Sequence, residues 1–98
     1  MTAPADPVRR DNALLLPDRV NLRNVRRLYE DFQREFNEGV DCLDCRGVSE
    51  ADSSAISLLL ACITLAKRHG RVLRIEGVNE QLETLARLYG VDALLRPE

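Results

Sequence analysis

Apolar and polar residues along this chain follow a spacing that switches between strand-like and helical several times. A short apolar run at 13–16, closed by a Pro-Asp pair, predicts a strand of about four residues that ends in a turn. From residue 22 to residue 38, apolar side chains recur every three or four positions, which predicts an amphipathic surface helix. Asn21 is its expected N-cap, and Gly39 is the expected residue at its C-terminal end.

The second strand–helix unit is more apolar than the first. Residues 40–45 lack helical spacing, which predicts a strand buried on both faces. Residues 46–51 are expected to form a loop, and Asp52 or Ser53 is expected to cap the next helix. That helix has two adjacent apolar lines, so it is either buried on two sides or lends one side to a partner. The lines are Ile56, Leu59, Leu60 and Ile63, with Leu59 and Ile63 expected to be fully buried, and Leu58, Cys62 and Leu65.

The third unit completes an alternation of strands and helices. Its strand is expected at 72–75, and its helix begins after Asn79 and continues to about Tyr89, whose side chain is expected to face inward. Alternating strands and helices predict an α/β fold, in which right-handed crossovers build a small sheet with α-helices packed on it. Residues 1–11 are expected to form a flexible N-terminal tail, and residues 12–98 a single domain.

Size and charge exclude several classes of function. The chain has 98 residues, which is enough for one domain with one modest core. Its net charge is -2, so a nucleic-acid partner is not expected, because phosphate-backbone binding needs a basic surface. No signal peptide is recognisable, and the richest apolar stretch, 55–66, is too short to cross a bilayer. The sequence therefore predicts a cytoplasmic chain with no direct membrane insertion.

Residues that could carry chemistry are few. Cys42 and Cys45 have the C-x-x-C spacing of redox pairs and metal sites, but within a strand their side chains point to opposite faces. A zinc site with Cys62 and His69 is not favoured, since those two lie two helical turns apart. The sequence contains no phosphate-binding loop, so no nucleotide or other cofactor is expected. We expect a non-catalytic protein, with a small thiol enzyme built on the cysteine pair as the alternative.

The segment from Asp44 to Leu60 carries a recognisable motif, D-C-R-G-V-S-E-A-D-S-S-A-I-S-L-L-L. It resembles the STAS domain family (sulfate transporter and anti-sigma factor antagonist). In that family an apolar strand ending in D-L-S is followed by a short loop, D-[ST]-[SGT]-G, and a run of Leu and Val. The resemblance places Asp44 on the strand-end Asp. It places Asp52 and Ser53 on the Asp and the phosphorylatable hydroxyl, and Ser54 on the small residue after them.

Two departures from the family pattern affect this segment. Cys45 and Arg46 replace the usual Leu-Ser, and Ala55 stands where the family has Gly. The resemblance nevertheless covers about residues 12–95. It implies that residues 12–98 form a single STAS-type domain, with a small mixed β-sheet and α-helices packed on it.

Within the family, the combination of motifs is most similar to the B subunits of the bacterial Mla (maintenance of lipid asymmetry) phospholipid transporters. The similar motifs are C-L-D in the strand, L-A-K-R-H-G after the central helix, and G-V-N-E-Q-L-E-T-L-A-R-L-Y near the C-terminus. The resemblance implies an accessory subunit that binds and activates or stabilises the ATPase of an ABC-type phospholipid transporter that maintains outer-membrane lipid asymmetry. The implied partners are that ATPase and, through it, the permease at the inner membrane.

The expected partner-binding surface lies at the start of the central helix. An anion there is favoured by the free backbone N–H groups and the helix dipole, so Ser53 is also a candidate phosphorylation site. By residue type alone, however, Ser53 is an ordinary helix cap. The alternative function is an anti-sigma-factor antagonist that is switched by phosphorylation of Ser53. The candidate partner-binding residues are Asp52, Ser53, Ser54, Ala55, Ser57 and Leu58.

Overall fold

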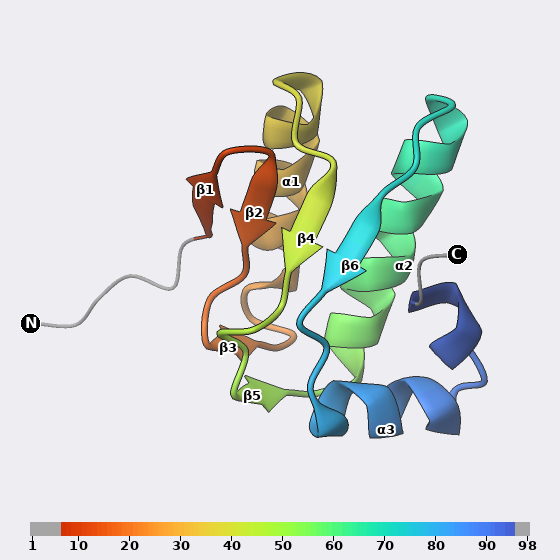
Figure 1. Ribbon diagram of the computed structural model, residues 1–98. Helices are drawn as coiled ribbons and strands as arrows, with labels where there is room; N and C mark the ends of the chain where they lie inside the picture. The colour runs from red at the N-terminus through yellow and green to blue at the C-terminus, as the bar shows by residue number, and fades with distance from the viewer. Residues whose placement is uncertain (1–6, 96–98) are drawn as a thin grey trace, which may run out of the picture.

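A computed structural model describes residues 7–95 of the chain (Figure 1). Its main sheet has four strands in the order β1-β2-β4-β6. The strands β2, β4 and β6 are parallel, whereas β1 pairs with β2 in the antiparallel sense, so the sheet is mixed as expected. These strands are β1 (Val8–Arg10), β2 (Ala13–Leu15), β4 (Cys42–Asp44) and β6 (Arg74–Glu76).

Strand β1 lies within the segment expected to be a tail, so that expectation is wrong for residues 8–10; residues 1–6 lie outside the described part. The strand pairs with β2 from Val8 opposite Leu15 to Arg10 opposite Ala13. The Arg9 guanidinium also donates to the Glu35 carboxylate at 3.2 Å and to the backbone carbonyl of Glu38, just after the first helix, at 2.9 Å. These long-range bonds hold a polar segment that has no apolar pattern of its own.

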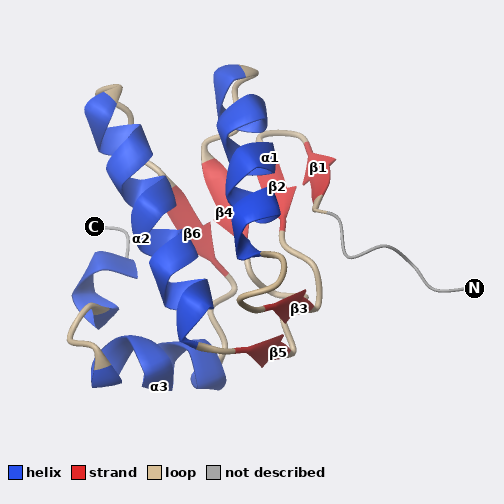
Figure 2. Ribbon diagram, turned by 180° about the vertical axis from the view of Figure 1, so that it is seen from behind, coloured by secondary structure: helices blue, strands red, loops and turns tan. Residues whose placement is uncertain are grey.

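Helices α1 and α2 lie on one face of this sheet, and α3 lies across the end at which α2 begins, as Figures 1 and 2 show from opposite sides. Helix α1 packs against α2, and α2 packs against α3. None of them is long and apolar enough to cross a membrane. Their bounds are α1 (Val25–Asn37), α2 (Ser53–Arg68) and α3 (Glu80–Leu88), followed by the 3₁₀ helix η1 (Asp92–Leu95).

Helix α1 begins three residues later than the apolar spacing predicts. The Asn24 side chain accepts the Asn21 backbone N–H at 3.0 Å and donates to the Arg19 carbonyl at 2.7 Å. The Asn21 side chain in turn accepts the N–H of Arg23 at 2.9 Å. Because both asparagines stabilise a turn over 21–24, the N-cap is Asn24 and not Asn21.

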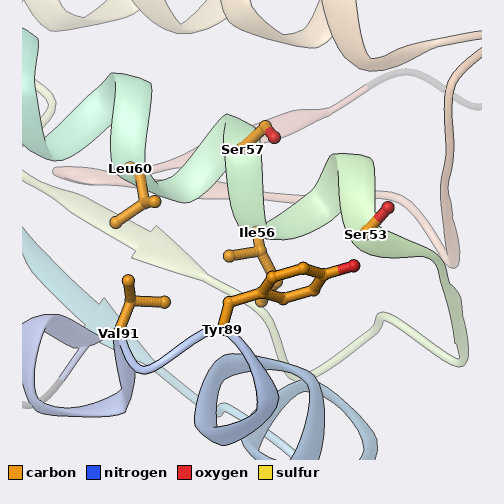
Figure 3. A pocket seen from close by; sticks show the side chains of 6 residues that line it. All are labelled: Ser53, Ile56, Ser57, Leu60, Tyr89 and Val91. Atoms are coloured by element: carbon orange, nitrogen blue, oxygen red, sulfur yellow. The ribbon is translucent and has the colours of Figure 1, made fainter.

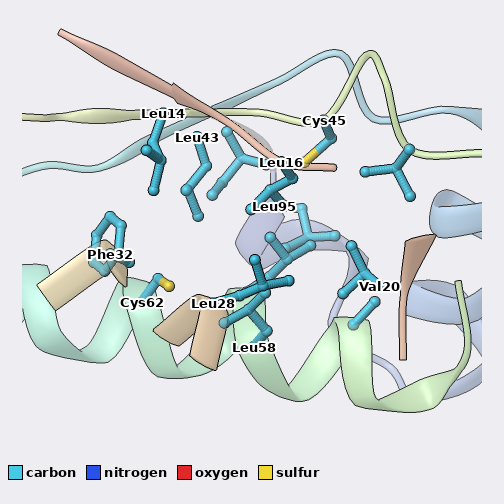
Figure 4. Packing of buried hydrophobic residues seen from close by; sticks show 14 of the residues in the cluster. Leu14, Leu16, Val20, Leu28, Phe32, Leu43, Cys45, Leu58, Cys62 and Leu95 are labelled. Atoms are coloured by element: carbon cyan, nitrogen blue, oxygen red, sulfur yellow. The ribbon is translucent and has the colours of Figure 1, made fainter. Parts of the chain in front are cut away.

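The core lies between the sheet and α1 and α2 (Figure 4). Leu59 is only 1 % exposed, as expected, whereas Ile63 is partly buried. Tyr89 was expected to face inward, but its side chain is 58 % exposed. It occupies the C-cap of α3, immediately before a turn at Gly90 with φ of +69°, so the helical spacing no longer decides its direction.

A second, two-stranded sheet brings the starts of two helices together. Strand β3 (Arg19–Val20) pairs in parallel with β5 (Glu50–Ala51), which lies in the segment expected to be a loop. Helix α1 follows β3 and helix α2 follows β5, so both helices begin at the same end of the molecule (Figure 1).

Candidate functional site

The first turn of α2 is held by the residue before it. Asp52 has extended backbone geometry, and its carboxylate accepts the Ser54 backbone N–H at 2.9 Å and the Ser54 hydroxyl. These hydrogen bonds lower the pKa of Asp52, because they favour its charged form. Asp52 is therefore the N-cap of α2, as the sequence predicts.

Ser53 is left free by this arrangement. Its side chain is exposed, and its hydroxyl makes no hydrogen bond to any other residue in the described range 7–95. Ser57 lies one turn further along α2, is also exposed, and likewise bonds to nothing in that range. The start of α2 therefore presents two unoccupied hydroxyl groups on one side of the helix.

These hydroxyls border a groove of about 310 Å³ between α2 and the chain that follows α3. Figure 3 shows the Tyr89 ring lying across from α2, with its hydroxyl directed toward the Ser53 end of the groove. The groove combines an apolar lining with hydroxyl groups at its rim, which is a surface that a protein side chain can enter. Its lining residues are Ser53, Ile56, Ser57, Leu60, Tyr89 and Val91.

A second polar arrangement lies at the end of β4, where Asp44 is 3 % exposed. The Arg46 guanidinium clamps its carboxylate: Nη2 donates to Oδ2 at 2.5 Å, and Nε contacts both oxygens at 3.0 Å. The Arg46 backbone N–H adds a bond of 2.9 Å. The side-chain hydrogen bonds from Arg46 are the main cause that lowers the pKa of Asp44, whereas its burial opposes them.

The comparisons with known proteins agree with this architecture. The family model described as "Mlab, STAS domain" matches residues 8–97. The chain belongs to the STAS domain family. Two relatives of this STAS domain, from Escherichia coli K12 and Shigella flexneri, are named intermembrane phospholipid transport system binding protein MlaB. Each is 37 % identical over 67 residues, which cover 68 % of this chain and 69 % of the relative.

A solved structure supports the fold of this STAS domain. It is a Thermotoga maritima protein assigned provisionally as an anti-sigma factor antagonist. The structural match covers 92 % of this chain and 81 % of the Thermotoga chain. The TM-score is 0.72 at 18 % sequence identity, so the likeness concerns the fold alone.

The structure exposes only some of the residues that were predicted to bind a partner. Asp52, Ser53 and Ser57 are exposed, and Ser54 is half-buried against Asp52. Ala55 and Leu58, however, are 3 % and 2 % exposed and belong to the core, which contradicts the expectation that they touch a partner.

The sequence did not reveal the opposite wall of the groove. Tyr89 and Val91 lie more than thirty positions from Ser53 along the chain, and only the packing of α3 beside α2 brings them there. The one local signal is the glycine at position 90, which ends the helical spacing and releases Tyr89 from the inward-facing side.

Acid should weaken this STAS domain partly through Asp44. The pKa of Asp44 in the folded state lies below the ordinary value. Its contribution to the free energy of unfolding is therefore fully present above the unfolded-state pKa of ~3.9, and it is lost as pH falls through the folded-state pKa. Asp44→Asn should therefore lower the free energy of unfolding by about 1–3 kcal/mol at pH 7. The loss should be smaller near pH 2, where the wild type and the variant both lack the negative charge. Urea unfolding at both pH values measures this.

The matched control is Glu76→Gln, because the Arg74–Glu76 pair is about half-exposed on both sides. An exposed ion pair contributes little to stability, so this variant should lower the free energy of unfolding by less than ~1 kcal/mol. Equal losses for the two variants at pH 7 would show that the clamp by Arg46 adds nothing.

The cysteines do not provide a reactive thiol. Burial raises the pKa of Cys42 to about 11 and that of Cys45 to about 12, and it also raises the pKa of Cys62. All three side chains are at most 1 % exposed. Since the thiolate is the nucleophile, these groups are poorly suited to thiol chemistry at neutral pH.

Proposed function

We propose that this STAS domain is a non-catalytic accessory subunit of an ABC-type phospholipid transport system, in which it binds and activates the ATPase subunit. The observation that carries the proposal is the 37 % identity with the two proteins named as phospholipid transport system binding proteins. The domain would act at the cytoplasmic side of the inner membrane, held there by the ATPase and, through it, the permease.

The composition of α2 supports the proposal that the domain binds a protein partner. From Ser53 to Ala66 the helix carries no charged residue over 14 positions, although Ser53, Ser57 and Thr64 are exposed. Charged residues are depleted at the centres of protein interfaces, whereas an ordinary solvated helix face carries several. The groove beside Ser53 and Ser57 adds an apolar recess to this uncharged surface.

Such a subunit can control hydrolysis without performing it. If it binds only the active state of the ATPase, it raises the population of that state by its differential affinity. At a free concentration a hundred times Kd, this amounts to ~2.7 kcal/mol. The proposal requires no bound nucleotide and no chemical step on the domain itself.

An ATPase assay tests the function directly. Removing the domain from the ATPase–permease complex should lower the hydrolysis rate, and adding the purified domain should restore it. The double variant Asp52→Ala, Ser53→Leu should fail to restore it, because it changes the cap and the free hydroxyl of the proposed contact. Equal rates with and without the domain would overturn the proposal.

A charge placed at Ser53 should weaken binding of the ATPase. Ser53→Glu puts a carboxylate at the helix N-terminus, where it does not harm the fold, but a packed contact would have to desolvate it. We expect Kd to rise at least tenfold, measured by titration calorimetry. Thr84→Glu adds the same charge at an exposed position of α3 and should leave Kd unchanged. Equal Kd values for the two variants would place the interface elsewhere.

A second function is supported by the free Ser53 hydroxyl at the start of a helix: an anti-sigma-factor antagonist switched by phosphorylation of that residue. It requires a partner kinase. An ATPase and a permease encoded beside this protein favour transport, whereas a kinase-like anti-sigma factor encoded there favours the switch. Co-purification with each candidate partner decides between them.

A further inference from the structure

The segment 46–52, which leads into α2 and its free Ser53 hydroxyl, is held from two sides. On the side of β3, the backbone N–H groups of Ser49 and Glu50 donate to the Asp18 carbonyl at 2.8 and 3.0 Å. Backbone bonds of this kind do not depend on which side chain a position carries. The second anchor lies on the other side of the segment, where α3 begins, and it is made by side chains of α3.

Asn79 uses both ends of its side-chain amide. The oxygen accepts the Leu82 backbone N–H at 2.9 Å, which caps α3. The nitrogen donates to the Val48 carbonyl at 2.7 Å, in a part of the chain 31 positions earlier. A helix cap needs only the acceptor, which Ser or Asp supplies equally well. The amide donor of Asn79 is therefore surplus to the cap and serves the segment before α2.

The contact made by this donor is shielded from water. Val48 is 3 % exposed, so its carbonyl depends on a partner within the protein. A second, longer bond runs in the same direction: the exposed Gln81 donates from its side-chain amide to the Ala51 carbonyl at 3.4 Å. Ala51 immediately precedes Asp52, the N-cap of α2. The start of α3 is thus tied to the residues that set where α2 begins.

Helix α3 also carries the opposite wall of the groove beside Ser53. It has nine residues, and at a rise of about 1.5 Å per residue it spans about 13 Å. Its first turn contacts the segment before α2, and Tyr89 at its other end lies across the groove from α2 (Figure 3). Because a short helix moves as a unit, a shift of its first turn also moves Tyr89 relative to Ser53. The bonds made by Asn79 therefore act on both walls of the groove.

We propose that Asn79 is a positioning residue for ATPase binding, whose amide N–H holds the segment before α2 in the arrangement that the ATPase recognises. This inference rests on the proposed function. A domain that binds in only one arrangement loses apparent affinity in proportion to the fraction of molecules that leave it. Without the amide donor, the Val48 carbonyl loses this partner and the segment populates other arrangements. Kd for the ATPase then rises although α3 remains capped.

Binding of the purified ATPase to the 98-residue chain, measured by titration calorimetry, tests this inference. Asn79→Ser and Asn79→Asp keep an acceptor for the Leu82 N–H but lack the amide donor, so each should raise Kd about five- to tenfold. Hydrogen exchange of the Leu82 amide should stay as slow as in the wild type, because the cap is kept. Gln81→Glu removes the second donor at an exposed position and should raise Kd about two- to threefold.

Phe36→Leu controls for a general loss of stability. Phe36 is 1 % exposed near the end of α1, at the opposite end of the molecule from the start of α2 (Figure 1). This variant should lower Tm at least as much as Asn79→Ser, yet it should leave Kd unchanged well below both melting temperatures. Thermal melting of every variant provides the comparison. An equal rise of Kd in Phe36→Leu and Asn79→Ser would overturn the inference.

The outcomes separate this inference from the function on which it rests. If the wild-type domain does not bind the ATPase, both fail. If Asn79→Ser and Asn79→Asp bind with the wild-type Kd, whether or not Asn79→Ala binds more weakly, Asn79 is at most a helix cap, and only the present inference fails. If exchange of the Leu82 amide becomes faster in the Asn79 variants, Gln81→Glu decides, because it leaves the cap intact. An unchanged Kd for Gln81→Glu then overturns the inference.

Discussion

Replacing Gly77 by alanine should destabilise this protein far more than the same replacement at Gly90. A Cβ at Gly77 would lie 2.2 Å from Cγ of Arg46 and 2.8 Å from its backbone nitrogen, so the backbone itself would have to move. Gly77 also has a φ of +73°, which disfavours any residue with a Cβ. Steric overlap and backbone strain together should lower the free energy of unfolding by about 3 kcal/mol or more, measured by urea denaturation.

Gly90 is the matched control, because it shares the backbone strain without the overlap. Its φ is +69°, and no atom lies within 4 Å of an added Cβ. Gly90→Ala should therefore cost about 1–2 kcal/mol. If both variants lost equal stability, the close approach of Gly77 to Arg46 would have no energetic weight.

Truncating Leu59 should strongly destabilise the core around α2. Leu59 is 1 % exposed and lines a small internal space together with Leu16 and Cys45, which directly follow β2 and β4. Leu59→Ala removes buried methyl groups and leaves a cavity, so it should cost about 2–5 kcal/mol. A domain of this size has only ~5–15 kcal/mol in total, and each kcal/mol lowers Tm by about 4–8 °C. A thermal melt of the purified variant measures the loss.

Val72→Ala provides the comparison for Leu59, since Val72 is 81 % exposed and its truncation should change stability by less than ~0.5 kcal/mol. A melting curve of Leu59→Ala that matches the wild type would mean that α2 buries a different face.

Elements decided by neighbouring residues could be predicted from the sequence. Asp52 caps α2 and Asn79 caps α3, with bonds of 2.9 Å to Ser54 and Leu82, because each cap needs only the next few residues. The start of α1 was misplaced for a related reason: Asn21 and Asn24 both suit a cap, and the bond from the Asn24 side chain to the Arg19 carbonyl decides between them.

Features that depend on contacts between residues far apart in the sequence could not be predicted from it. Strand β1 depends on Arg9 reaching α1, and β5 depends on pairing with β3, so neither has a local pattern. The same holds for the site. The family motif identified Asp52 and Ser53, whereas Tyr89 and Val91 reach the groove only after the chain has folded. Ala55 and Leu58 were assigned to the surface because adjacency in sequence does not distinguish the sides of a helix.

The small β3–β5 sheet has a consequence for assembly in the cell. It joins Arg19 to Glu50 and Val20 to Ala51, so the starts of α1 and α2 become neighbours only in a correctly folded chain. A misfolded copy contains the residues at both helix starts but cannot present them together. A partner that contacts the starts of both helices would therefore discriminate among copies of this protein by their conformation. Only correctly folded copies would then enter a complex with that partner, and misfolded copies would remain exposed to proteolysis.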